Sequence, residues 1–82
     1  FRHVLFRSER YAPHTQGLPH EHPLAFVVAY LSAGRVKTTA LDGGSKVTTH
    51  VAGDVVWHPP GKYGVENIED APLERVVVEF KQ

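Results

Sequence analysis

Two histidines separated by one residue are the clearest candidates for chemistry in this sequence. His20 and His22 flank Glu21, and Pro23 follows, so the pair lies at a strand end or a bulge and not inside a hydrogen-bonded ladder. Side chains two residues apart on an extended segment project from one face, and two imidazoles at that spacing can chelate one metal ion. Zinc sites use about three or four protein ligands, so two imidazoles alone make a weak site. The alternative is a solvated loop with two polar residues.

Tyr63 and His58, later in the chain, are the two candidates for a third metal ligand. A tyrosine phenolate can bind Fe(III), but an unperturbed tyrosine has a pKa of about 10, which favours Tyr63 as a pocket wall with its hydroxyl at the mouth. By alternation His58 shares a face with Val56, opposite Trp57. Apolar neighbours favour Trp57 as a core residue. This interpretation places His58 at a rim or an interface.

The other ionisable residues show weaker patterns. Glu21 points to the opposite face from the two histidines, so it is poorly placed as a third ligand. His50 lies on the polar face of its strand and is expected to be exposed to solvent. Arg75 and Glu79 alternate with apolar residues and are expected on an ordinary charged outer face.

Composition limits the classes of function. Nine Lys and Arg balance nine Asp and Glu, which excludes the basic surface of proteins that bind nucleic acid or anionic membranes. The absence of cysteine excludes disulfides, thiolate catalysis and Cys-ligated zinc. No apolar run approaches the ~20 residues of a membrane span, and no signal-peptide pattern opens the chain. A cytoplasmic protein is therefore expected.

Chain length predicts one small domain, residues 1–82. A core of this size stabilises a fold only marginally, and small β domains often gain stability by oligomerising. A homodimer is therefore the expected assembly.

The elements that must position these side chains are β-strands. No apolar stripe with a helical period is present, and short runs rich in β-forming residues are separated by Gly, Pro, Asp and Asn. The clearest unit is a hairpin with its turn at residues 42–45. In the last strand, Val76, Val78 and Phe80 share a face and are assigned to the core. The expected strands cover residues 3–6, 24–31, 35–41, 46–51, 55–58, 63–69 and 73–80. This spacing is typical of a β-sandwich or a jelly-roll barrel.

Two stretches of the sequence resemble the motifs of the cupin superfamily. The residues that resemble its second motif are Gly53, Pro59, Pro60, Gly61 and Asn67. The residues that resemble its first motif are His20, His22 and Gly34. The glycine and proline spacing of the second motif is fairly specific, whereas a His-x-His pair alone is a weak signal. The resemblance covers residues 3–81 and is to small single-domain bacterial cupins.

The resemblance implies a double-stranded β-helix, the cupin jelly-roll barrel, usually dimeric through exchanged N-terminal strands. Metal-binding cupins hold Fe, Mn, Ni, Zn or Cu with two histidines and a glutamate from the first motif and a histidine from the second. His20 and His22 match the first two ligands. No glutamate is present at residues 24–27, and Tyr63 stands where the second-motif histidine is expected. The loop at 10–19 is short, which implies a barrel shortened by about one strand.

Three functions are consistent with these residues. The favoured hypothesis is a cupin with a weak or vestigial metal or small-molecule pocket and a binding or accessory role, with a divalent metal at His20 and His22. The second hypothesis is a metal-dependent cupin enzyme with dioxygenase-like or small-acid chemistry. The third is a structural barrel whose histidines are idle. The residues assigned to the pocket are Tyr63, Phe26, Asn67 and His58, although Phe26 also fits a core position and Asn67 also fits a structural hydrogen-bonding role.

Overall fold

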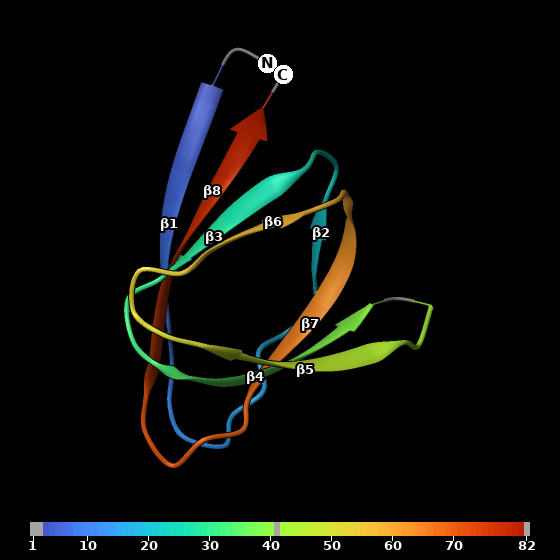
Figure 1. Ribbon diagram of the computed structural model, residues 1–82. Coiled ribbons are helices and arrows are strands. Elements are labelled where there is room, and N and C mark those ends of the chain that lie inside the picture. Colours follow the sequence, from blue (N-terminus) through green and yellow to red (C-terminus); the bar gives the residue numbers. More distant parts are fainter. Residues whose placement is uncertain (1–2, 41, 82) are drawn as a thin grey trace.

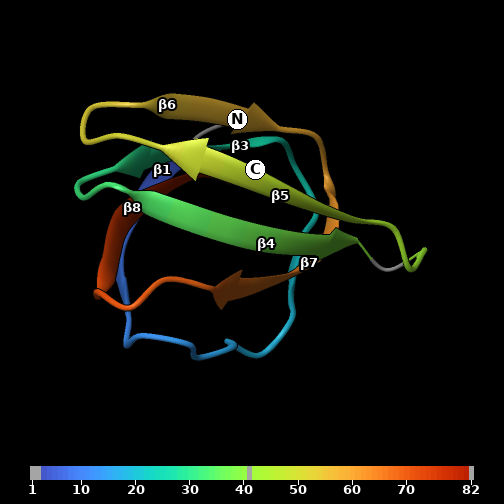
Figure 2. The ribbon, with the colours of Figure 1, turned by 60° about the horizontal axis from the view of Figure 1, so that its bottom comes forward.

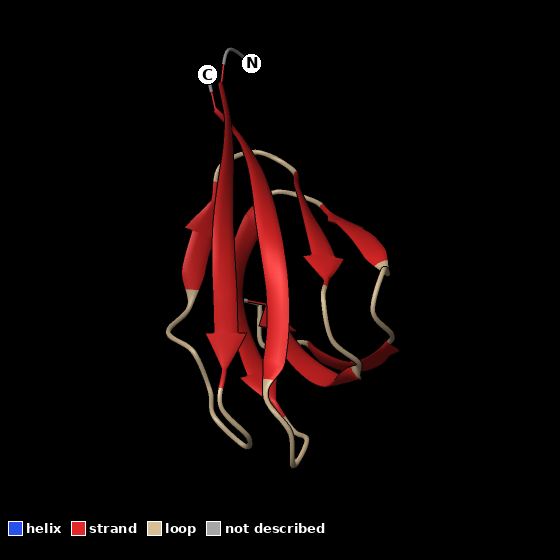
Figure 3. Ribbon diagram, turned by 90° about the vertical axis from the view of Figure 1, so that its left-hand side faces the viewer, coloured by secondary structure: helices blue, strands red, loops and turns tan. Residues whose placement is uncertain are grey.

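The chain folds into two four-stranded antiparallel sheets that face each other (Figures 1 and 3). The computed structural model describes residues 3–40 and 42–81. Strands in these ranges are β1 (His3–Tyr11), β2 (His20–His22), β3 (Phe26–Tyr30), β4 (Gly34–Ala40), β5 (Ser45–His50), β6 (Val55–His58), β7 (Gly61–Asn67) and β8 (Leu73–Lys81). None of the elements in these ranges is a helix long and apolar enough to cross a membrane.

The strand order is that of a jelly roll. One sheet has the order β1-β8-β3-β6, and the other has the order β2-β7-β4-β5. Each connection crosses from one sheet to the other except the β4–β5 hairpin, which extends past its neighbours (Figure 2). All eight strands of a jelly roll are therefore present in the described residues. The expected loss of about one strand is therefore not observed in these residues, and the shortest strand is β2, with three residues.

The glycine of the second motif builds the turn between β5 and β6. Gly53 has φ = 96°, a left-handed conformation that glycine adopts without a steric penalty. Its N–H donates to the carbonyl of Tyr30 at 2.8 Å, and the N–H of Tyr30 donates to the carbonyl of Asp54 at 2.8 Å. The turn is thereby fixed to the end of β3, which sets where β6 begins.

The core lies between the sheets and is centred on β3. Alternate residues of this strand, Phe26, Val28 and Tyr30, are buried, as expected for a strand with one face turned to the opposite sheet. The other buried apolar residues are Val36, Val65, Leu73 and Val77.

The assignment of Val76, Val78 and Phe80 to the core face is wrong. The buried side chains of β8 come from the opposite face and are Leu73, Arg75 and Val77. Arg75, expected on an outer face, is 6% exposed because its partner across the β1–β8 ladder is Glu9, whose carboxylate accepts a hydrogen bond from Arg75 Nε at 2.8 Å. Both faces of β8 carry apolar residues, so alternation alone does not decide which face is buried, and the ion pair with Glu9 compensates the charge of Arg75 in the buried orientation.

The assignment of Trp57 to the core is also wrong. Trp57 is 63% exposed, and His58 instead points inward and stacks on Phe26 with ring centroids 4.9 Å apart. The β3–β6 register explains the difference, because Phe26 is paired with His58 and Val27 with Trp57. Directly opposed residues lie on the same face of a sheet, so the buried Phe26 carries His58 inward.

The environment of His50 also differs from the expectation. It was expected to be exposed, but it is 8% exposed, and its imidazole stacks on the Tyr30 ring at 3.8 Å. The polar face of β5 is therefore the face that points between the sheets. The apolar residues Val47 and Val51 lie on the exposed face instead.

Candidate functional site

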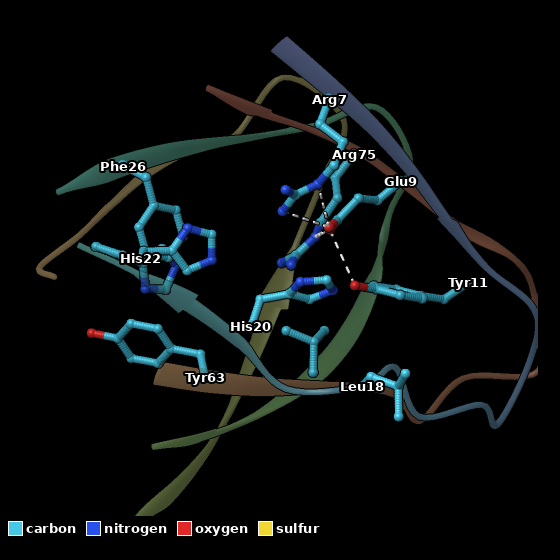
Figure 4. Close-up of a pocket in the computed structure, with 11 residues that line it drawn as sticks. Arg7, Glu9, Tyr11, Leu18, His20, His22, Phe26, Tyr63 and Arg75 are labelled. Atoms are coloured by element: carbon cyan, nitrogen blue, oxygen red, sulfur yellow. Dashed lines mark hydrogen bonds and ion pairs between the residues drawn. The ribbon is translucent and has the colours of Figure 1, made fainter. Parts of the chain in front are cut away.

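The positions of the two cupin motifs converge on a small cavity inside the barrel (Figure 4). We call it the motif cavity. Its volume is about 20 Å³, which is room for about one water molecule. It is lined by Arg7, Glu9, Tyr11, Leu18, His20, His22, Phe26, His58, Tyr63, Val65 and Arg75.

The four positions that carry metal ligands in metal-binding cupins lie together here. His20 is paired with Tyr63 across the β2–β7 ladder, and the His22 and Tyr63 rings lie 6.4 Å apart. Phe26, in the stretch that lacks the glutamate, stacks on His22 at 3.8 Å and contacts Tyr63 edge-on at 5.7 Å. This chain therefore places two imidazoles and two six-membered carbon rings where a ligand set is expected.

This donor set does not fit a resident metal ion of the family's type. Within residues 3–40 and 42–81, no group of three or more His, Cys, Asp or Glu side chains is placed to hold a metal. His22 Nδ1 lies 2.9 Å from a carboxylate oxygen of Glu79, so one of the two available imidazoles is already engaged on one side. The Tyr63 hydroxyl donates to the carbonyl of Pro59 at 2.9 Å.

A charged network forms the β1–β8 side of the motif cavity (Figure 4). Glu9 accepts hydrogen bonds from Arg75, Arg7 and Tyr11. Burial alone raises the pKa of Glu9, but the charges of Arg75 and Arg7 and the hydrogen bonds to Arg75 and Tyr11 outweigh it and hold the pKa below its ordinary value. Arg7 Nη1 also donates to Glu79 at 3.2 Å. These charges compensate one another within the protein.

His58 separates the motif cavity from a second, larger one. We call the second cavity the β5–β6 cavity; its volume is about 230 Å³. It is lined by Tyr30, Thr38, Lys46, Thr48, His50, Val56, Trp57 and His58. Burial and the positive charge of Arg75 lower the pKa of His58, so this imidazole is neutral at neutral pH. The barrel interior thus has a small compartment and a larger one, with His58 between them.

The structure brings some of the sequence-assigned residues together and separates others. His20, His22, Phe26, His58 and Tyr63 all line the motif cavity. Asn67 does not line it: its fully buried amide donates to the carbonyls of Tyr11, Ala12 and Ala71 and ties together the chain segments at one end of the barrel.

Sequence reasoning missed the charged residues of the interior and the polar face of β5. Arg75 and Glu9 carried no usable signal, because the charged residues Glu74 and Arg10 stand directly beside them, as on an ordinary outer face. Lys46 and Thr48 posed a different difficulty. A polar face on a hairpin strand normally faces water, and only the packing of the two sheets turns it inward.

Solved structures with the same architecture identify the fold. A cupin domain from Bordetella pertussis has a TM-score of 0.86 and 24% identity to this chain, over 96% of this chain and 82% of that one. A conserved cupin 2 barrel domain protein from Salinispora arenicola has a TM-score of 0.74 and 24% identity, over 95% and 63%. Oxalate decarboxylase from Bacillus subtilis, a protein with Mn(II) centres, has a TM-score of 0.72 and 28% identity, over 93% of this chain and 21% of that one.

No protein-family profile matches the sequence, and no curated protein matches it. The evidence from known proteins is therefore evidence of fold. Two antiparallel sheets in jelly-roll order, together with these structures, confirm what the two sequence motifs predicted: the chain has the fold of the small bacterial cupins.

Proposed function

We propose that this chain is a cupin that binds a small molecule between its two sheets and does not depend on a resident metal. The proposal rests on which side chains fill the motif cavity. Tyr63 stands at one of the four ligand positions, and Phe26 belongs to the stretch that lacks the glutamate. These two rings and the imidazole of His22 pack together at the cavity. A metal-centred reaction has neither enough donors nor room for a substrate beside them.

The β5–β6 cavity supports the binding half of the proposal. It is roughly tenfold larger than the motif cavity, and its wall combines polar groups with the side chain of Val56 and the aromatic ring of Tyr30. Small-molecule sites are typically concave and largely apolar, with a few placed polar groups. A small molecule bound in the β5–β6 cavity would give the protein a binding or accessory role.

Metal analysis together with ligand screening tests this function. Protein purified without a histidine tag is expected to hold no stoichiometric Fe, Mn, Ni, Zn or Cu, and its thermal stability is expected to be the same with and without chelator. A library of small polar metabolites, screened by thermal shift in the presence of EDTA, is expected to contain stabilising ligands. Stoichiometric metal that is lost in His20→Ala and His22→Ala variants, or a screen without any stabilising ligand, would contradict the proposal.

We also propose that the protein forms a homodimer through the outer face of the β1-β8-β3-β6 sheet, with a second copy of the chain as the occupant. The residues of this face are Val4, Phe6, Ser8, Val27, Ala29, Val55, Trp57, Val76, Val78 and Phe80. The charged side chains that the described residues place on this face are Arg10 and Glu74 at one end, and they form an ion pair with each other at 3.6 Å. Two copies related by a twofold axis can therefore meet without bringing unpaired like charges together.

The size of this face sets the expected strength of the dimer. Four strands spaced by about 4.8 Å, with four to nine residues at about 3.4 Å each, cover on the order of 400 Å² in projection. A standard interface buries about 800 Å² per partner, so the dimer is expected to be weak and concentration-dependent. Strand β1 supports this face-to-face arrangement more than an exchange of N-terminal strands, because all nine of its residues pair with β8 of the same chain.

A further inference from the structure

The β5–β6 cavity has the size of a site for a small ligand. Its volume of about 230 Å³ compares with the ~10–15 Å³ that one water molecule needs and with the ~300–1,000 Å³ of typical drug-sized pockets. It therefore has room for a compact organic molecule and excludes a large one.

The charge of the cavity wall is unbalanced. Lys46 is the one charged residue among the described residues that line it, and neither Asp nor Glu lines it. Within residues 3–40 and 42–81, the ammonium group of Lys46 is not part of an ion pair or a hydrogen bond. Arg75, the buried cation of the interior, is compensated by Glu9, whereas Lys46 lines the cavity and is exposed to solvent. Lys46 thus has an unused positive charge beside a cavity.

A hydroxyl donor lies next to this charge. Thr38 is the direct cross-strand partner of Lys46 in the β4–β5 ladder, so the two side chains share the face that points between the sheets. The Thr38 hydroxyl makes no hydrogen bond in the part of the chain that the structure describes, whereas the Thr48 hydroxyl is already within 2.7 Å of His50 Nε2. An ammonium and a free hydroxyl side by side match the two oxygens of a carboxylate.

The opposite wall offers different chemistry. It comes from β6, with Val56 and atoms of Trp57, and from the ring of Tyr30. His58, neutral because burial lowers its pKa, adds a single imidazole and no charge. A molecule that spans the cavity would meet an anion-binding group on β4 and β5 and an apolar or aromatic surface on the other side.

From this arrangement we infer that the β5–β6 cavity binds a small organic monoanion, a carboxylate attached to a compact apolar or aromatic body. The carboxylate contacts Lys46 and Thr38, and the apolar body packs against Val56 and Tyr30. This inference rests on the proposed binding function and adds the chemical class of the ligand and the residues that recognise it.

Titration calorimetry on the purified full chain in EDTA, at pH 7.5 and low salt, tests the inference with four probes. Benzoate and butyrate carry the anion, and benzamide and butyramide are their neutral counterparts of nearly equal shape. The acids are expected to bind about tenfold or more tightly than the amides. The hydrogen bond from Lys46 to a charged carboxylate is stronger than the one to a neutral amide, and the difference is enough for about a tenfold change in affinity. Added salt is expected to weaken binding of the acids and not of the amides.

Two lysine variants separate a local effect from net charge. Lys46→Met is expected to lose about tenfold in affinity for the acids and little for the amides. Lys37→Met makes the same change in net charge on exposed Lys37 of β4, which does not line the cavity, and is expected to bind all four probes as the wild type does. Circular dichroism and thermal melting check that both variants are folded.

Each contrary result has a distinct meaning. If acids and amides bind equally, or if Lys46→Met and Lys37→Met weaken the acids equally, the anion inference is overturned while small-molecule binding stands. If none of the four probes binds at millimolar concentration, the anion inference is overturned, and the metabolite screen alone then decides the proposed function. A stabilising neutral ligand in that screen would keep the function and replace the ligand class.

Discussion

Phe6 of β1 and Trp57 of β6 stand at the two ends of a single cross-strand row on the outer face of their sheet. Phe6 is paired with Val78, and Val78 with Val27. Val27 is paired in turn with Trp57. The two end residues are 73% and 63% exposed, although both are large and apolar. A row of this kind, four strands wide, is the central feature of the proposed dimer face.

The dimer face makes a direct prediction about self-association. Phe6→Ser and Trp57→Ser are each expected to weaken the dimer about tenfold or more, because each removes a large apolar side chain from the interface. Sedimentation equilibrium over a range of concentrations measures this. Leu18→Ser is the matched control, since Leu18 is 83% exposed and lies outside this face. A wild type that stays monomeric at millimolar concentration, or a dimer that neither serine variant weakens, would refute the arrangement.

The buried ion pair between Glu9 and Arg75 is expected to be costly to break from one side only. Glu9→Gln leaves the Arg75 guanidinium buried without a compensating charge and is expected to destabilise the fold by about 3 kcal/mol or more in urea unfolding. The double variant Glu9→Leu with Arg75→Met is expected to recover most of that loss. Glu69→Gln, which breaks the exposed pair with Arg35, is the control and is expected to change the melting temperature little. Equal losses at the buried and exposed pairs would contradict this account.

Acid is expected to destabilise the fold in two stages. Burial lowers the folded-state pKa of His58 and of His22 below the ordinary 6.5, so the unfolded chain takes up protons first as the pH falls. Stability is therefore full above pH 6.5 and declines below it. A second decline is expected below pH 4.5, where Glu9, with its lowered folded-state pKa, is protonated first in the unfolded chain.

Urea unfolding between pH 8 and about pH 3 measures both stages. His58→Phe retains a ring that can stack on Phe26 but cannot take up a proton, so it is expected to flatten the first decline. His3→Gln, at an exposed position, is the control and is expected to leave it unchanged. A first stage of the same size in His58→Phe and the wild type would show that His58 does not contribute to it.

Asn67 is expected to matter for stability and not for ligand binding. Its side-chain amide donates to three backbone carbonyls, and its oxygen accepts from the N–H of Glu69 at 3.0 Å. Asn67→Ala leaves these buried groups without partners and is expected to cost about 2–3 kcal/mol in urea unfolding. Thr15→Ala removes one exposed hydrogen bond to the Ala12 carbonyl and is expected to cost much less. A large loss of ligand affinity in a folded Asn67→Ala protein would place this residue at the site instead.

The sequence by itself determined the architecture. The positions of glycine and proline in the second motif fix the turns, and Gly53 does so because its left-handed backbone is accessible to glycine at little cost. Short β-forming runs between those turns leave few alternatives to a jelly roll. The resemblance to the cupin motifs also implied that His20 and Tyr63 lie close together, and the two are cross-strand partners in the β2–β7 ladder.

The tertiary structure decided which face of each strand turns inward. Alternation distinguishes the two faces of a strand only when one is apolar and the other polar, and β6 and β8 have apolar residues on both. Pairing with β3 turned His58 inward and Trp57 outward, and pairing with β1 gave Arg75 its partner Glu9. Lys46 and Thr38 likewise line a cavity only because the second sheet packs opposite their own sheet. Those contacts join residues that are far apart in the chain, so no local sequence pattern predicts them.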